Sequence, residues 1–333
     1  MMRSGNFQPP ATGTAAGAQA PVPESATPSA GDGKEDLRAS LKRLRVEVNG
    51  RLFALKLALC AVLTAAGITA ALQQPWWLRC AGIVLTGCMF AHAAELQHQT
   101  LHGLGFRGHR ANTVAGIVLG VPMLISFAAY RVAHLRHHRY LGTPLNREFF
   151  DYGDQYGAEE DRNRLRTALN WFVRFSMLHH YALFLRNLLA SLRGRDFEGE
   201  TATTSRRIRR DHLVVLAALV AMTVLSFALG RPVVVLVWAL PLFLVAAPVH
   251  AAIELPEHYG CETLDEDAFA NTRTIRSNRF MYWFTNGNNF HVEHHLLPNL
   301  PIERLPEAHV LVRDRLRHFH SGYGRFFYRL LRK

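Results

Sequence analysis

The stretch Asn286-Gly-Asn-Asn-Phe-His-Val-Glu-His-His295 ends in three histidines, His291, His294 and His295. On an α-helix, residues three and four positions apart lie on one face, with Cβ atoms about 5 to 6 Å apart. We therefore expect the three imidazoles to point to a common spot. Neutral imidazoles that converge in this way form a metal site.

The same spacing recurs twice more in the chain. His134, His137 and His138 repeat the H-x-x-H-H pattern, and His98 and His102 are four positions apart. A single such pair is usually a solvated helix face, but three boxes with helical spacing in one chain indicate metal binding.

Long apolar segments predict the fold class. Each is about 20 residues long, which at 1.5 Å per residue crosses the roughly 30 Å of hydrocarbon in a bilayer. Helices buried in a soluble core rarely run this long without a polar stripe. We therefore predict an all-α integral membrane protein with four transmembrane helices. The segments are 52–73, 77–97, 212–229 and 232–252.

The formal net charge of +12 raises the question of a nucleic-acid partner. Of the 38 Lys and Arg residues, Arg79 and Arg231 fall in the two short loops that this topology places outside, and nearly all others fall inside. This is the positive-inside bias of membrane proteins, with a basic cytosolic face. We therefore expect a multi-pass membrane protein with both termini and all histidine boxes on the cytosolic side, and no nucleic-acid partner.

Residues 111–130 are apolar but are not predicted to cross the membrane. A single crossing would place His134 and His98 on opposite sides of the bilayer, where they cannot share a metal centre. Gly116, Gly120 and Pro122 favour a break near the middle of this segment. We predict a re-entrant or interfacial hairpin.

The composition of the remaining segments predicts the structure that each one adopts. Residues 1–36 predict a disordered tail, and residues 37–51 predict a basic amphipathic helix, either on the membrane surface or in solvent. Residues 52–310 form the predicted catalytic domain, and residues 311–333 a basic C-terminal tail. The four cysteines lack a C-x-x-C spacing, so free thiols are expected. His179 and His180 lack a third partner and are expected to be structural.

Eight box histidines exceed the four ligands of one tetrahedral site and suit two metal ions. Imidazole accommodates iron, zinc, copper or nickel, so the ligands alone do not select the metal. A centre just below the lipid can receive an acyl chain from the membrane. Breaking an unactivated C–H bond requires an oxidant made from O2 at a redox metal, which favours a non-haem di-iron centre.

The boxes, their spacing and the four-span layout resemble the membrane fatty acid desaturase and hydroxylase superfamily over about residues 50–310. The most specific part is Asn288-Asn-Phe-His-Val-Glu-His-His-Leu-Leu-Pro298. The resemblance implies two iron ions, O2 as co-substrate and a mushroom-shaped fold with a cytosolic, helical metal-binding cap. It also implies a ninth ligand at His258, and it places Glu254 near the metal ligands without making it one.

Asn289 and its neighbours Asn286 and Asn288 are candidates for a helix cap or for donors that orient His291. Two features depart from the common desaturase pattern. Gln99 stands where many members carry an acidic residue, in a box outline that is similar to that of carotenoid ketolases. The phrase Glu257-His-Tyr-Gly260 is similar to a motif of alkane monooxygenases.

The favoured function is an O2-dependent fatty-acyl desaturase. A lipid, alkane or carotenoid hydroxylase or ketolase is the alternative, because both reactions share the first hydrogen abstraction. A metal transporter is less favoured, since ionisable residues occur only near the ends of the spans, at Lys56, His92, Glu95 and His250.

No cytochrome-like domain is visible, so a separate ferredoxin or cytochrome with its reductase is expected to supply electrons. Its acidic surface would match the basic face. The same face suits an acyl-carrier or coenzyme A thioester, or membrane lipid. The sequence leaves open the acyl carrier, the position of attack and the oligomeric state.

Overall fold

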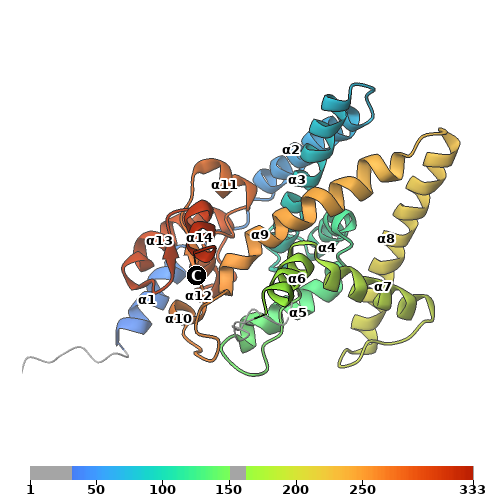
Figure 1. Ribbon diagram of the computed structural model, residues 1–333. Coiled ribbons are helices and arrows are strands. Elements are labelled where there is room, and N and C mark those ends of the chain that lie inside the picture. The colour runs from blue at the N-terminus through green and yellow to red at the C-terminus, as the bar shows by residue number, and fades with distance from the viewer. Residues whose placement is uncertain (1–31, 151–162, 333) are drawn as a thin grey trace, which may run out of the picture.

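The described part of the chain, residues 32–150 and 163–332 of a computed structural model, is built almost entirely from helices (Figure 1). The α-helices are α1 (Asp32–Arg43), α2 (Gly50–Ala71), α3 (Trp76–Leu101), α4 (His109–Gly120), α5 (Phe127–Tyr140), α6 (Arg164–Phe175), α7 (Leu178–Leu192), α8 (Ala202–Ala228), α9 (Ala247–His258), α10 (Ala268–Asn271), α11 (Arg279–Phe284), α12 (His291–Leu296), α13 (Leu305–Val312) and α14 (Tyr323–Leu330). Short 3-10 segments are η1 (Val121–Met123), η4 (Ile302–Arg304) and η5 (Arg313–Arg315), and the π-helical segments η2 (Val235–Ala239) and η3 (Pro241–Ala246) precede α9.

Within residues 32–150 and 163–332, four helices are long and apolar enough to cross a membrane: Gly50–Ala71, Trp76–Leu101, Ala202–Ala228 and Val235–His258. They contain the four predicted segments, apart from a few terminal residues, which confirms the all-α membrane fold. Two helical hairpins, α2 with α3 and α8 with η2, η3 and α9, extend away from a cap that contains α1 and α10 to α14 (Figure 1). The name cap is used below for α1 together with α10 to α14.

The second and fourth of these helices run beyond the predicted spans, to Leu101 and His258. In α3, every residue from Met89 to Leu101 is buried. These extensions enter the interior between the spans and the cap, and they carry predicted metal ligands.

The segment after α3 is bent rather than straight. The helix pair His109–Met123 and Phe127–Tyr140 meets at an angle of 99°. Leu124, two residues after Pro122, has a left-handed backbone with φ 59° at the break. A right-angled bend fits the predicted hairpin over 111–130 and also a broken span, so the hairpin stays a prediction.

The N-terminal helix differs in its bounds from the predicted 37–51. It covers Asp32–Arg43 and ends before Asn49, whose side chain caps α2 by accepting a hydrogen bond from the Leu52 amide at 3.1 Å. Leu41 of α1 is buried in a cluster with Leu305 and other residues of the cap. Residues 1–31 of the predicted disordered tail lie outside the described residues.

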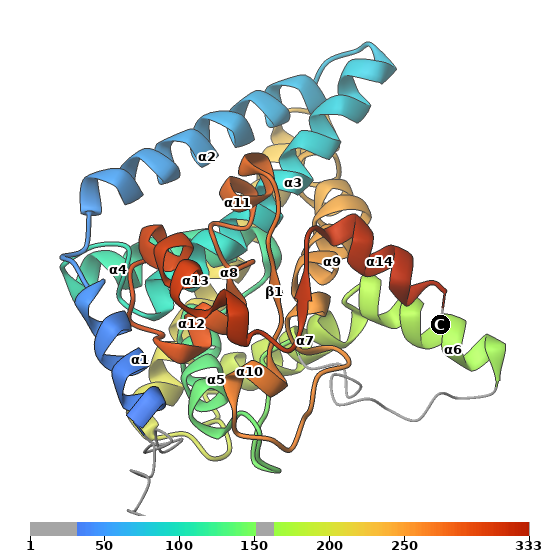
Figure 2. The same ribbon diagram turned by 90° about the vertical axis from the view of Figure 1, so that its left-hand side faces the viewer.

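The segment predicted as a basic tail, residues 311–333, contains a strand and a helix. The two-residue strands β1 (Thr274–Ile275) and β2 (Phe319–His320) pair in parallel. Figure 2 shows β1 between α12 and α14, at the centre of the cap. Phe326 of α14 packs with Leu255 of α9 and Ile275 of β1, so this segment joins the cap to the fourth span.

Candidate metal centre

The turn before α12 sets the direction in which that helix enters the interior. Asn286 and Gly287 both have left-handed backbones, with φ 48° and 82°. A Cβ atom at Gly287 would lie 2.7 Å from Cγ2 of Ile302, so a side chain does not fit there. The opening Asn-Gly of the stretch is thus a tight turn, and the helix that follows begins at His291.

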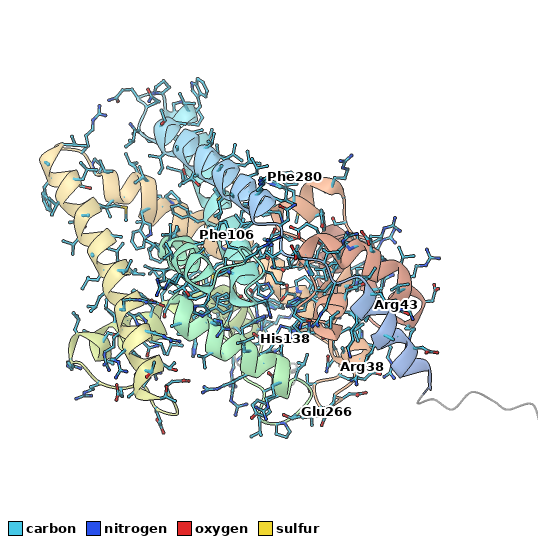
Figure 3. All side chains as sticks on the ribbon, turned by 180° about the vertical axis from the view of Figure 1, so that it is seen from behind. Arg38, Arg43, Phe106, His138, Glu266 and Phe280 are labelled. Atoms are coloured by element: carbon cyan, nitrogen blue, oxygen red, sulfur yellow. The ribbon has the colours of Figure 1, made fainter. Side chains whose placement is uncertain are left out.

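Five histidines from three parts of the chain converge on one point, which we call the five-histidine site. Their nearest ring nitrogens all lie within 4.8 Å of one another. The site takes residues from α3 and the position just after it, from α5, and from α12. They are His98, His102, His134, His138 and His294. Figure 3 labels His138 on α5, close to the side of that helix that faces the cap.

Four other histidines form a second group, which we call the four-histidine site. Their nearest ring nitrogens also lie within 4.8 Å of one another. One comes from α5, one from the end of α9 and two from α12: His137, His258, His291 and His295. All nine predicted ligands are therefore brought together in two groups, and His179 and His180 are in neither.

One expectation about the H-x-x-H-H boxes was wrong. Each box was expected to aim its three imidazoles at a common spot, but it divides them between the two sites. His291 and His295 serve the four-histidine site, while His294 serves the five-histidine site. Successive residues of an α-helix are rotated by about 100° around its axis. The side chains at positions i and i+4 therefore point in nearly the same direction, and the side chain at i+3 points away from both.

The spacing of the ring nitrogens fits a metal ion better than hydrogen bonding. Nε2 of His134 lies 2.7 Å from Nε2 of His98 and 2.9 Å from Nε2 of both His102 and His138. One imidazole nitrogen has a single site for a hydrogen bond and cannot satisfy three neighbours. Nitrogens that bind one ion at about 2.1 Å lie roughly 3 to 3.4 Å apart, close to the distances found here.

The protonation state of the α12 histidines also suits a metal. Burial, followed by the neighbouring histidines, lowers the pKa of His291, His294 and His295 well below the usual value. These imidazoles are therefore neutral at pH 7, as metal ligands must be.

Polar partners hold two rings of the four-histidine site in place. Nδ1 of His137 lies 2.9 Å from Oδ1 of Asn146 and 2.5 Å from Oε1 of Glu148. Nδ1 of His258 donates to the Asn271 carbonyl at 2.9 Å. With the proton on Nδ1, the Nε2 lone pair of each ring faces the site, an arrangement typical of metal-binding histidines.

Among the described residues, the carboxylates within 4 Å of a predicted ligand lie beside the four-histidine site. Oε2 of Glu257 is 3.2 Å from Nε2 of His291, and Glu148 is also 3.9 Å from His258. Burial alone would raise the pKa of Glu148, but His137 and His258 lower it. Within the described ranges, no carboxylate oxygen lies within 4 Å of a ring nitrogen of the five-histidine site.

Glu254 belongs to a third, smaller group with Glu95 and His250. Oε1 of Glu254 is 3.5 Å from Nε2 of His250, whose Nδ1 is 3.6 Å from Oε1 of Glu95. Asn288 donates to Glu95 at 2.6 Å. Glu254 thus lies outside both histidine groups, and its role near the ligands stays a prediction.

The predicted asparagines support the turn and the strand. Asn289 accepts from the Thr285 hydroxyl at 3.1 Å and donates to the Ile275 carbonyl at 2.8 Å, so it contacts β1 and not the His291 ring. Asn286 donates to Oε1 of Gln99 at 3.0 Å. Gln99, which departs from the usual desaturase pattern, thereby links α3 to the turn before α12.

Several supporting residues were not predicted from the sequence. Glu293 is buried inside the third box and accepts from the Thr274 hydroxyl at 2.6 Å, with Nδ1 of His309 also at 2.6 Å. Its place between box histidines was the only available signal. Glu148 lies in an irregular segment after α5, where no periodicity marks it.

Comparison with known proteins agrees with this geometry. The family model for fatty acid desaturases matches residues 75–327. The chain belongs to the fatty acid desaturase family. Membership implies an oxidoreductase that is generally iron-dependent, works in a membrane setting and acts on lipid.

Two named desaturases are similar in sequence to this desaturase-family protein. Dihydrorhizobitoxine desaturase of Bradyrhizobium elkanii is 26% identical over 256 residues, covering 73% of this chain and 70% of the relative. The sn-1 oleoyl-lipid 12-desaturase of Picosynechococcus is 25% identical over 298 residues, covering 84% and 82%.

Proposed function

We propose that the protein is an O2-dependent di-iron desaturase that introduces a double bond into a fatty-acyl chain of a lipid at the cytosolic face of the membrane. The observation that carries the proposal is the division of nine histidines, from helices far apart in sequence, into two groups at the inner ends of apolar helices. The five-histidine and four-histidine sites would each hold one iron. When bound, iron supplies the O2-derived oxidant that an unactivated C–H bond requires and that zinc does not provide.

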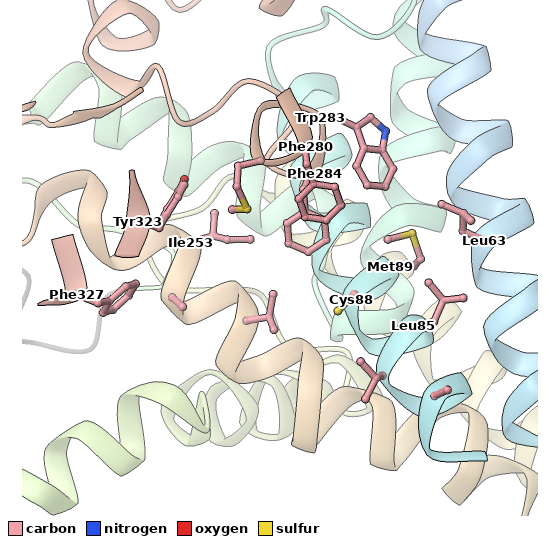
Figure 4. Close-up of a pocket in the computed structure, with 15 residues that line it drawn as sticks. Leu63, Leu85, Cys88, Met89, Ile253, Phe280, Trp283, Phe284, Tyr323 and Phe327 are labelled. Carbon is pink, nitrogen blue, oxygen red and sulfur yellow. The ribbon is translucent and has the colours of Figure 1, made fainter. Parts of the chain in front are cut away.

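An apolar cavity of about 830 Å³ lies between α3, α9, α11 and α14 and suits an acyl chain (Figure 4). Leu85 and Met89 come from one span and Ile253 from another, while Phe280 and Phe284 of α11 project between them. Phe280 is 61% exposed, and Val84 on α3 is 51% exposed. Val84 lies on a helix long and apolar enough to cross a membrane, and Phe280 lies on α11 of the cap beside it. The mouth of the cavity would therefore face the membrane, and an acyl chain could enter it from the side.

The lining of the cavity continues toward the four-histidine site along α9. Ile253 lines the cavity, and Glu257 lies four residues later on the same face of that helix. Oε2 of Glu257 is 3.2 Å from Nε2 of His291. A chain lying in the cavity would thus extend toward the histidine groups.

The surrounding residues orient ligands and exclude water. Glu148 and Asn146 keep a proton on Nδ1 of His137, so that Nε2 faces the site. On the cavity side, Nδ1 of His92 donates to the Phe284 carbonyl at 2.7 Å, and its ring stacks on Phe284. This bond holds the aromatic wall of the cavity against α3.

Electrons would come from a separate ferredoxin or cytochrome with its reductase. The basic surface offers such a donor an electrostatic partner. The acyl carrier, whether phospholipid, coenzyme A, acyl-carrier protein or free acid, remains part of what the experiment must identify.

Mass spectrometry of lipids from cells that express the chain tests this function. We expect a product lighter than its substrate by two hydrogens, and no product from a His294→Ala variant that remains in the membrane. His179→Ala, an exposed histidine on α7, is the matched control and should retain activity. A product that gains one oxygen would establish a hydroxylase instead, and normal turnover in His294→Ala would contradict both readings.

A further inference from the structure

A basic groove of about 360 Å³ lies between α4, α5 and the start of α8, outside both histidine sites. Four arginines and a histidine line it: His109, Arg110, Arg131, Arg207 and Arg210. Arg210 pairs with the buried Asp211 at 2.8 Å. Among the described residues, Arg110, Arg131 and Arg207 have no carboxylate partner, and the groove is lined by no acidic side chain.

Helix ends add to the positive potential of the groove. His109 and Arg110 occupy the first turn of α4, whose N-cap residue Gly108 provides no side-chain acceptor for the first amides. Thr204 and Arg207 lie in the first two turns of the 27-residue helix α8. Free amides at the start of α4, combined with guanidinium groups that have no carboxylate partner, form a binding site for phosphate.

The groove borders exposed apolar surface. Val114 lines it and is 62% exposed, and Val118, one turn further along α4, is 63% exposed. On α8, the apolar run begins immediately after His212 with the exposed Leu213 and Val214. The arginines therefore stand at the height where headgroups meet hydrocarbon, and basic pockets between spans at this height bind anionic headgroups.

We propose that this groove binds the phosphate of an anionic membrane phospholipid, with the arginines on the headgroup and an acyl chain along the exposed valines of α4. A soluble phosphate would share the arginines but would leave the adjoining apolar surface unused. The inference does not rest on the proposed function, because it is tested by binding rather than by turnover.

The bound headgroup would contact α5, the helix that carries three of the predicted metal ligands. Arg131 lies one turn before His134 on α5, and its Nε donates to the Leu101 carbonyl at 3.0 Å, next to His102. The phosphate, Arg131 and the end of α3 thus form a continuous set of contacts beside the five-histidine site. The lipid stabilises the packing of α3, α4, α5 and α8 at that point.

Native mass spectrometry and thermal unfolding of the purified full-length protein test the proposal. In detergent, phosphatidylglycerol should bind with one tight site per chain and raise the unfolding temperature, whereas phosphatidylcholine should bind much more weakly. The double variant Arg110→Gln with Arg207→Gln should weaken phosphatidylglycerol binding by at least about 10-fold. Arg325→Gln with Arg329→Gln, which removes two exposed arginines of α14, is the charge-matched control and should bind as the native protein does.

Thr204→Glu provides a second test that does not depend on removing arginines. Thr201 is the N-cap of α8, so Glu at position 204 completes a capping box, which favours the helix while it repels phosphate from the groove. We expect an unchanged or higher unfolding temperature without lipid, and loss of the rise with lipid. Equal weakening by the α14 control would show general electrostatic attraction, and binding of inorganic phosphate as tight as that of the lipid would show a soluble-anion site; either result overturns the proposal.

Discussion

The two histidine sites differ in their surroundings although they share helices. The five-histidine site is surrounded by imidazoles, with no carboxylate within 4 Å in the described part of the chain. The four-histidine site has one fewer imidazole and lies beside Glu148 and Glu257. Carboxylates make a coordinated imidazole more basic and add negative charge near the ion. The two metal ions would therefore be electronically unequal.

The two histidine sites also differ in which part of the molecule lies beside them. Helix α9 links the four-histidine site to the apolar cavity, because Ile253 lines the cavity and Glu257, one turn later, lies 3.2 Å from Nε2 of His291. Arg131 instead connects the end of α3 beside the five-histidine site to the basic groove. One site thus faces the proposed acyl chain, and the other adjoins the proposed headgroup position. Three predictions test this division, in order of decreasing effect.

Removing one ligand from each site should separate the two ions. We expect His102→Ala and His258→Ala each to keep about one iron per chain in place of two, because their ligands belong to different groups. Product formation should fall at least about 100-fold in both, since even residues behind the ligands commonly cost 10 to 100-fold. Iron content of the purified variants and lipid mass spectrometry measure these outcomes. Two retained ions in either variant would disprove the division.

Glu293→Gln should affect both sites together. Glu293 is buried on α12, and its bonds to Thr274 and His309 hold the helix that supplies ligands to both groups. Loss of a buried charge-assisted hydrogen bond costs about 1.5 to 3 kcal/mol, so the unfolding temperature should drop and both ions should bind more weakly. Thermal unfolding and iron titration check this. Glu307→Gln, on the exposed surface of α13, should change neither.

Glu148→Gln should weaken only the four-histidine site. Glutamine can still accept the hydrogen bond from Nδ1 of His137, but the negative charge is lost. We expect the affinity for one ion to fall by about 10-fold while the other is unchanged, which makes an iron titration biphasic. Glu198→Gln, an exposed carboxylate between α7 and α8, serves as the control. A uniform loss at both sites would mean that the two centres are not independently tuned.

Much of the fold could be predicted because membrane helices carry a strong signal. A run such as 212–229 has to satisfy its backbone within the hydrocarbon, and only a helix of that length does so. Helix ends were less accurate: α1 ends at Arg43 rather than at residue 51, because Asn49 already caps α2. The local sequence 44–51 does not reveal whether these residues extend α1 or precede the cap of α2.

For the histidine boxes too, local features could be predicted from the sequence and tertiary contacts could not. The types and spacing of residues 286–295 were enough to predict a metal-binding helix, because helical periodicity is local. Glu148 and Asn146 escaped prediction, since their importance arises only from where an irregular segment passes His137. Gln99 was read as a departure from a pattern, and its contact with Asn286 became visible only in the folded chain.

The sequence by itself determined that the chain spans a membrane and carries three histidine boxes, because hydrophobic length and helical spacing are properties of single segments. Only the tertiary structure decided how the histidines of each box are divided between the two sites. His294 belongs to a different site from His291 and His295, and His137 belongs to a different site from His134 and His138. The reason is geometric. A helix rotates by about 100° per residue, so the partners that surround it determine which face each imidazole completes.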